Sequence, residues 1–183
     1  MNLQDLLLGK RAAVADRWLQ LTLATYSPDT AAFLSNEKDE FANPVGQRLR
    51  EGIPVIIAAL LEGNSDEAYL AQLGEIIQVQ SVQNFPPSRA LAFIFLLKEA
   101  ILQELDKELR EARILAEWTR FAGRIDQLAL RSMDLYSQFR EKVYEIRVND
   151  VKRRVSGLQR RLNWVGDDRE LESDCLSDNI QSK

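Results

Sequence analysis

Apolar residues recur along most of this chain at the three- and four-residue spacing of an amphipathic helix. In the first such stretch, residues 3–25, they stand at Leu3, Leu7, Val14, Trp18, Leu19, Leu21 and Leu23. No segment has the apolar–polar alternation that a half-exposed strand requires, and clusters of β-branched residues are short. The pattern therefore predicts an all-α protein.

Prolines, glycines and capping residues divide the rest of the pattern into further helices. We expect these at residues 30–34, 44–61, 64–83, 86–110 and 113–164. Gly63 follows the second of them as a C′ residue, and Asn64 with Glu67 resembles a loose capping box for the third. Pro54 should kink or restart the helix that contains it. Residues 90–97 are apolar on every side, which predicts the central buried helix.

The segment Lys38-Asp39-Glu40-Phe41-Ala42-Asn43-Pro44-Val45-Gly46 contains a strong helix start. Asn43 is the expected N-cap, and Pro44 suits the first helical position, whose N–H has no partner within the helix. Phe41 is near enough to pack back on the first turns as a hydrophobic staple. Gly46 lowers helix propensity, so we expect another chain segment to cross close to it. By spacing alone, this is a well-capped surface helix.

The last expected helix changes its pattern near residue 144. From there apolar residues alternate by four and three, with Val148, Val155 and Leu162 at a-type positions and Tyr144, Val151, Leu158 and Val165 at d-type positions. About three heptads is the minimum for a coiled coil, and Gly157 weakens the helix by about 1 kcal/mol relative to alanine. Two interpretations stay open: a helix that packs on its own domain, or a parallel dimer stalk.

Charge is distributed unevenly over the same region. Eight basic and three acidic residues lie between Arg140 and Arg161, whereas six acidic residues and one basic residue lie between Asp167 and Asp178. A basic helix beside an acidic tail can bind anions or nucleic acid, but a solvated face with a disordered tail is the simpler interpretation. No interleaved aromatic residues support DNA contact, and the net charge of −4 does not indicate a nucleic-acid-binding protein. The expected organisation is a helical domain at 1–143, a helical extension at 144–166 and an acidic disordered tail at 167–183.

Composition limits the cell compartment. The 183 residues, 45% of them hydrophobic, suit one globular domain. Cys175 is the only cysteine, which excludes an intramolecular disulfide and fits a reducing compartment. The first residues include an acidic one before any apolar run, so we expect no signal peptide. The longest uninterrupted apolar run has eight residues, against about 20 for a membrane span. We therefore expect a cytoplasmic protein without membrane insertion.

The chain contains no histidine, and this excludes several kinds of site. Histidine-ligated haem, histidine metal sites, a phosphotransfer histidine and a Ser-His-Asp triad all require it. The glycines are scattered singly, so no glycine-rich phosphate loop is present. We expect no catalytic residues, no metal and no cofactor, and hence a protein that is not an enzyme.

Charged residues at the edges of the expected core are the remaining candidates for chemistry. Lys98 follows the apolar run of the central helix, and Arg124 with Asp126 lies on the closing helix. Such residues are usually paired, so we expect ion pairs among them or with Asp39. The alternative is that Lys38, Arg48, Lys98 or Arg124 lines a small anion-accepting pocket.

The sequence resembles the RsbRD N-terminal domain family along roughly residues 15–155. The first match is Lys38-Asp39-x-Phe41-x-Asn43-Pro44-Val45-Gly46. Upstream, the similar residues are Trp18, Leu23, Ala24, Thr25, Tyr26, Thr30, Phe33 and Leu34. Downstream they are Val82-Gln83-x-Phe85-x-Pro87-Ser88, Ala90-x-Ala92-Phe93-x-Phe95-Leu96-Leu97-Lys98, Arg124-Ile125-Asp126-x-Leu128-Ala129-Leu130, Tyr136, Arg140-Glu141-Lys142 and Tyr144-Glu145-Ile146-Arg147. Two departures are Gln80-Ser81, where a basic residue is expected, and Ser132-Met133, where a bulkier apolar pair is expected.

The resemblance implies a fold and a function. Members are sensory domains related to the non-haem, globin-like input domains of stressosome proteins and of some sensor kinases. It implies a globin-like multi-helix domain and signal input into a stress-response or kinase pathway. Together with the heptad spacing, we expect a homodimer that acts through protein–protein contacts on a separate protein partner. The candidate residues for ligand or partner binding are Lys38, Asp39, Phe41, Asn43, Arg48, Gln83, Lys98 and Arg124. The alternative function is an accessory or assembly subunit of an anaerobic respiratory or sulfur-metabolism complex.

Overall fold

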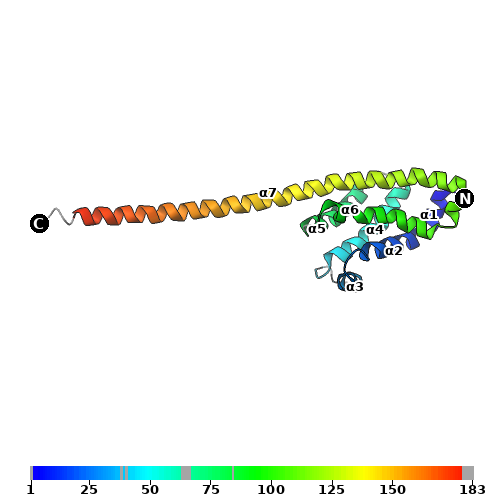
Figure 1. Ribbon diagram of the computed structural model, residues 1–183, viewed down its shortest axis with the longest axis horizontal. Coiled ribbons are helices and arrows are strands. Elements are labelled where there is room, and N and C mark those ends of the chain that lie inside the picture. Colours follow the sequence, from blue (N-terminus) through cyan, green and yellow to red (C-terminus); the bar gives the residue numbers. More distant parts are fainter. Residues whose placement is uncertain (1, 38, 40, 63–66, 84, 179–183) are drawn as a thin grey trace. The chain divides into compact units, whose positions relative to one another are not determined.

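The computed structural model describes residues 2–37, 39, 41–62, 67–83 and 85–178, with no side chains for residues 67–68 or beyond Gln159. Every regular element in this part of the chain is a helix, as Figure 1 shows. The elements are α1 (Leu3–Gly9), α2 (Arg11–Leu23), α3 (Pro28–Asn36), α4 (Pro44–Glu62), α5 (Glu67–Val82), α6 (Pro87–Glu104), the 3₁₀ helix η1 (Glu108–Arg110) and α7 (Ala112–Asp178). This confirms the predicted all-α class with a long C-terminal helix.

The chain divides into two compact units, Met1–Arg140 and Glu141–Lys183, and α7 contributes to both. The helical assignment of α7 reaches Asp178, further than the end near Trp164 that the sequence indicated. The organisation expected at 1–143, 144–166 and 167–183, including a disordered tail, stays a prediction. None of the described helices is both long enough and apolar enough to cross a membrane.

The N-terminal helix that we expected at 3–25 is two helices, with Lys10 between them. Lys10 has φ −105° and ψ 12°, and its ammonium donates a hydrogen bond to the Glu104 carbonyl at 2.6 Å and pairs with Glu108 at 2.8 Å. The break lets the short α1, which buries Leu3, Leu6 and Leu7, contact both α2 and α4. A periodic apolar pattern continues through such a break, so periodicity alone did not reveal it.

The next helices follow their expected start signals more closely. Ser27 caps α3 and Pro28 occupies its first position, which lengthens the helix beyond the expected 30–34. Helix α4 runs through Pro54 without restarting. At Gly52 the two helices α4 and α5 approach so closely that a Cβ would lie 2.7 Å from Ile76 Cδ1 of α5. The predicted end signals at Gly63 and Asn64 lie outside the described residues.

The core of the first unit is centred on α2 and α6. Trp18 of α2 is fully buried, its indole N–H donates to the carbonyl of Phe93 in α6, and the two rings stack at 6.0 Å. Most of α6 is buried, as residues 90–97 predicted, but Phe95 is half exposed. The buried residues of α7 in this unit are Ile114, Trp118, Ile125, Leu128, Ala129, Ser132 and Tyr136. Because apolar contacts between helices provide most of the stability of such a fold, these residues hold α7 in place up to residue 136.

Candidate functional site

The carbonyl end of α3 meets the amino end of α4 at Asn43, whose side chain is almost completely buried. Its Oδ1 accepts a hydrogen bond from the Gly46 N–H at 2.8 Å, which is the expected N-cap bond. Its Nδ2 donates to the carbonyls of Leu34 at 3.0 Å and Glu37 at 2.9 Å. One amide side chain therefore satisfies polar groups at the ends of two helices.

Gly46 lies against this junction, and a side chain there would collide with it. A Cβ at Gly46 would stand 2.4 Å from Nδ2 of Asn43 and 2.5 Å from the carbonyl oxygen of Leu34. The prediction that another segment crosses close to Gly46 is therefore confirmed, and the segment is the end of α3. The glycine makes room for the bonds of Asn43.

Arg50 completes the junction and was missed in the sequence. Its Nη1 donates to the Leu34 carbonyl at 2.7 Å, and its Nη2 donates to the Glu37 carbonyl at 2.9 Å. It stands seven residues after Asn43, so both side chains lie on one face of α4. That spacing was the available signal, but an arginine on a helix has many other uses. We refer to Asn43, Gly46 and Arg50, with the two carbonyls of Leu34 and Glu37, as the α3–α4 clamp.

The residues before the clamp form a local turn. Asp39 Oδ1 accepts hydrogen bonds from the N–H groups of Phe41 at 2.8 Å and Ala42 at 3.2 Å. The ring of Phe41 is 97% exposed, so the predicted hydrophobic staple is wrong. The two turn bonds fix the Phe41 backbone while its ring stays in solvent. Lys38, the other candidate here, lies outside the described residues.

The remaining charged candidates are spread over the first unit. Arg48 pairs with Glu75 of α5 at 3.2 Å and with Glu51 at 3.6 Å. Lys98 pairs with Asp126 at 2.6 Å, which confirms one of the expected ion pairs. Since Asp39 bonds its own turn, it is not the partner of Lys98. Gln83 is exposed directly after α5.

Arg124 is the candidate that reaches a cavity. It lines a hollow of about 380 Å³, and its Nη1 donates to the Leu60 carbonyl at 3.2 Å. Arg48 and Lys98, the other described members of the anion-pocket alternative, are paired with carboxylates instead. The described candidates of the predicted set thus occupy separate places: the turn before the clamp, the clamp, two ion pairs, the end of α5 and this cavity.

The two departures from the family pattern lie in buried places. Gln80 is 3% exposed and Ser81 is fully buried, and Arg140 Nη1 donates to the Ser81 carbonyl at 3.2 Å. Ser132 is also fully buried and donates its hydroxyl hydrogen to the Leu128 carbonyl at 2.7 Å, whereas Met133 is partly exposed. A basic side chain at the first place would need a buried partner, and the neutral residues remove that requirement.

Burial and pairing shift the pKa of two groups in the first unit. Desolvation raises the pKa of Tyr26 above its usual value, and the nearby charge of Arg89 opposes that shift. The hydrogen bond from Lys10 lowers the pKa of Glu108, whose side chain is partly exposed. Neither group lies in the clamp or lines the cavity, so these shifts do not indicate a site for proton transfer.

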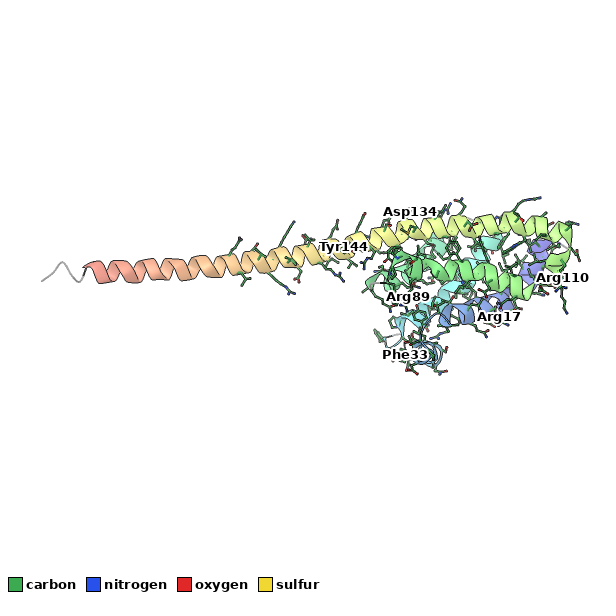
Figure 2. The ribbon with its side chains drawn as sticks, in the orientation of Figure 1. Arg17, Phe33, Arg89, Arg110, Asp134 and Tyr144 are labelled. Carbon is green, nitrogen blue, oxygen red and sulfur yellow. The ribbon has the colours of Figure 1, made fainter. Side chains whose placement is uncertain are left out.

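In the second unit, α7 carries the row of apolar residues predicted as stalk positions. The described members are 47% to 59% exposed, namely Tyr144, Val148, Val151, Val155 and Leu158. Figure 2 marks Tyr144 on the helix. Ile146, which is not part of this row, is also exposed, at 68%. Side chains are not described at Leu162 and Val165. We refer to these seven positions as the heptad row.

Comparison with known proteins identifies the family. The profile of the RsbT co-antagonist protein rsbRD N-terminal domain matches residues 12–150. The match includes nearly all of α2, every helix from α3 to α6, the clamp and the first part of the heptad row. No curated protein and no solved structure matches the chain. The profile match extends over most of the sequence and points to a stressosome-type sensory or regulatory domain, and the chain belongs to the rsbRD N-terminal domain family.

Proposed function

We propose that this protein is a non-catalytic input domain that dimerises through the heptad row and transmits a signal to a separate protein partner. Its family is one of stressosome-type sensory and regulatory domains. The observation that carries the proposal is the heptad row itself, because large apolar side chains at this spacing are half exposed along a helix. The occupant that we propose for the row is a second copy of the chain.

The spacing of the heptad row favours a coiled coil rather than a groove for a different partner. Apolar side chains alternate by four and three residues, so they form one narrow seam that a second identical helix can cover. Burying the exposed half of each valine or leucine contributes on the order of 1 kcal/mol. Over so few heptads the total is modest. A weakly associated stalk has both paired and unpaired populations, and a signal can shift the balance between them, which suits an input domain.

The charges beside the row make different contacts in a parallel and in an antiparallel pair. Arg147 and Arg154 occupy g-type positions, and Glu145 and Lys152 occupy e-type positions. In an antiparallel pair the g-type positions face one another, so arginine would oppose arginine. In a parallel pair each g-type residue faces the e-type residue five positions further on. Arg140 then faces Glu145, which is attractive, while Arg147 faces Lys152.

Light scattering on the full chain tests the proposal. Wild-type protein should be a dimer, and the double variant Val151→Glu/Val155→Glu should be a monomer, because four carboxylates would face one another in the seam. The matched control is Asn149→Glu/Ser156→Glu, which adds the same charge at b-type positions and should leave the dimer intact. A wild-type monomer at micromolar concentration contradicts the homodimer. A dimer that the valine variant leaves unchanged contradicts the stalk.

Deletion of residues 144–183 gives a second measure of the same contact. Removing the whole heptad row should weaken the dimer at least as much as the valine variant does. If the truncated chain stays as dimeric as the full chain, the contact lies in the first unit and the heptad row is not a stalk.

A cytoplasmic location, which the sequence favours, belongs to the same proposal.

Haem is the cofactor for which a globin-like fold calls for a direct test. The chain has no histidine to serve as the usual proximal ligand, so the purified protein should show no Soret absorption. A stoichiometric haem would contradict the non-haem assignment, whatever residue supplied the ligand.

A further inference from the structure

A cavity of about 380 Å³ opens where α1 begins, α4 ends and α7 makes its first turns. Its polar wall includes the guanidinium groups of Arg113, Arg120 and Arg124, and its apolar wall includes Leu61 and Phe121. Hollows with an apolar wall and a few convergent polar groups are the usual form of small-molecule sites.

The charged residues of this wall come from one face of α7. Residues 113, 117, 120 and 124 follow one another at intervals of four, three and four, so their side chains project from the same side of the helix. Three are arginines, and Glu117 is the only acidic residue among the described residues that line the cavity. The wall therefore has an excess of positive charge in a protein whose net charge is −4.

The carboxylate of Glu117 is already occupied. Its Oε2 accepts a hydrogen bond from the Leu3 N–H at 2.7 Å, which serves the first turn of α1. Its Oε1 lies 3.4 Å from Nε of Arg113 in an ion pair. The negative charge of Glu117 is thus directed at Leu3 and Arg113, and Arg120 and Arg124 have no carboxylate partner among the residues that the structure describes.

Carbonyl groups at the end of α4 accept hydrogen bonds from some of the donors that line the cavity, but not from all of them. Arg124 donates to the Leu60 carbonyl, and Gln4 Nε2 donates to the Leu61 carbonyl at 2.9 Å. These bonds cap the carbonyl end of α4, which otherwise would repel an anion. Arg124 uses one N–H in this way and keeps its other donors. Arg120 has no hydrogen bond or ion pair to any residue that the structure describes.

We propose that this cavity binds a small organic anion, with its carboxylate or phosphate group on Arg120 and Arg124 and its apolar part against Leu61 and Phe121. Guanidinium groups hold both kinds of oxyanion through paired, charge-assisted hydrogen bonds. The apolar wall distinguishes such a ligand from an inorganic anion, which gains nothing from Leu61 and Phe121. This proposal does not depend on the proposed dimer, because its test measures the affinity of the cavity for an anion and not signal output.

Calorimetric titration of the full chain with hexyl phosphate, hexanoate and inorganic phosphate tests the site. At least one of the two organic anions, hexyl phosphate or hexanoate, should bind more tightly than inorganic phosphate. The one that binds more tightly identifies the headgroup. Binding should weaken as salt is raised, because the contact is between charges. The proposal would be overturned if neither organic anion bound, or if inorganic phosphate bound as tightly as they do.

Arginine variants locate the binding. Arg120→Ala should raise the dissociation constant about tenfold or more, the loss expected for a charge-assisted hydrogen bond. Arg120→Lys should recover only part of the affinity, because lysine keeps the charge and loses the planar fork. Arg11→Ala is the matched control: Arg11 is exposed, lies outside the cavity and carries the same charge. Equal weakening by Arg11→Ala and Arg120→Ala would mean a general charge effect and would contradict the site.

The stability of the variants needs its own measurement. Arg120 has no polar contact with the described residues, so Arg120→Ala should unfold at the same urea concentration as wild type in the absence of anion. With saturating hexyl phosphate, wild type should gain stability and Arg120→Ala should gain less, since a ligand stabilises the state that it binds. No gain in wild type at saturating ligand would count against the site as firmly as absence of heat.

Discussion

Helix α7 carries two apolar faces made from similar residues, and only one of them is covered within its own unit. In the first unit Ile125 is fully buried and Leu128 is nearly so. In the second unit Val151 and Leu158 are more than half exposed. Helical periodicity predicts that each face needs cover, but it does not say what covers it.

The two faces differ in their spacing and in their polar content. The first face includes Ser132 and Tyr136, whose hydroxyl groups donate to carbonyls of the same unit. The second follows a strict alternation of four and three residues with arginines on its edge. Polar groups that find fixed partners are typical of a domain core, and a regular narrow stripe is typical of a seam between helices.

Truncating the covered face should have the largest effect. Ile125→Ala should lower the free energy of unfolding by about 2–5 kcal/mol, because it leaves a cavity in a packed core. Urea unfolding followed by circular dichroism measures this, and the loss should not depend on protein concentration. Val151→Ala is the counterpart on the exposed face, and its effect should appear only where the protein is dimeric. A large, concentration-independent loss for Val151→Ala would mean that the chain itself covers this face.

The α3–α4 clamp extends the contrast to buried polar groups. Asn43→Ala and Arg50→Ala should each cost about 1–2 kcal/mol, because each removes hydrogen bonds at the ends of α3 and α4. Both residues donate to the carbonyls of Leu34 and Glu37, so either can serve these carbonyls alone. The double variant should therefore cost more than the sum of the single losses. Strict additivity in the same urea assay would show that the two donors act independently.

The clamp also shows what could be predicted from the sequence. Asn43, Pro44 and Gly46 predicted a capped helix with a close neighbour, because caps and glycines act through local backbone geometry. The sequence did not reveal that the neighbour is the end of α3, or that Arg50 shares its carbonyls. Those contacts depend on tertiary packing. The prediction of a hydrophobic staple at Phe41 was wrong for a similar reason, since hydrogen bonds to Asp39 fix the turn and leave the Phe41 ring in solvent.

The same limit applies to the candidate sites. Arg124 was singled out as a member of an anion pocket, whereas Arg113 and Arg120 were not. Their spacing was readable, but the ends of α1 and α4 that make a cavity beside them come from distant parts of the chain. Lys98 and Asp126 were expected to pair because charges at the edge of a core usually do, and they lie 2.6 Å apart.

Two glycines give opposite expectations for the same substitution. Gly46→Ala should destabilise the protein by about 1–3 kcal/mol, because the new Cβ would overlap Asn43 and the Leu34 carbonyl. Gly157→Ala should raise helix stability by about 1 kcal/mol, since no described atom outside its own stretch of helix lies within 4 Å of the place that the new methyl group would take. Thermal unfolding tests the first, and the dimer dissociation constant tests the second. Gly157 occupies a c-type position, outside the seam. A weaker dimer in Gly157→Ala would instead place this residue in a tight contact between the two copies.

The smallest effects belong to the ion pairs of the two units. Lys98–Asp126 joins α6 to α7 at 2.6 Å, and Asp150–Arg154 lies within α7 at 2.8 Å. Double-mutant cycles to alanine should give about 0.5–1 kcal/mol for the first pair and about 0.3–0.5 kcal/mol for the second, because both are partly solvated. The first pair also places Lys98 near the ring of Phe95, a contact that salt screens less than an exposed ion pair. Raising the salt concentration should therefore abolish the coupling of Asp150 with Arg154 before that of Lys98 with Asp126. The reverse order would mean that the pair in the second unit is shielded from solvent, as a seam between two copies would shield it.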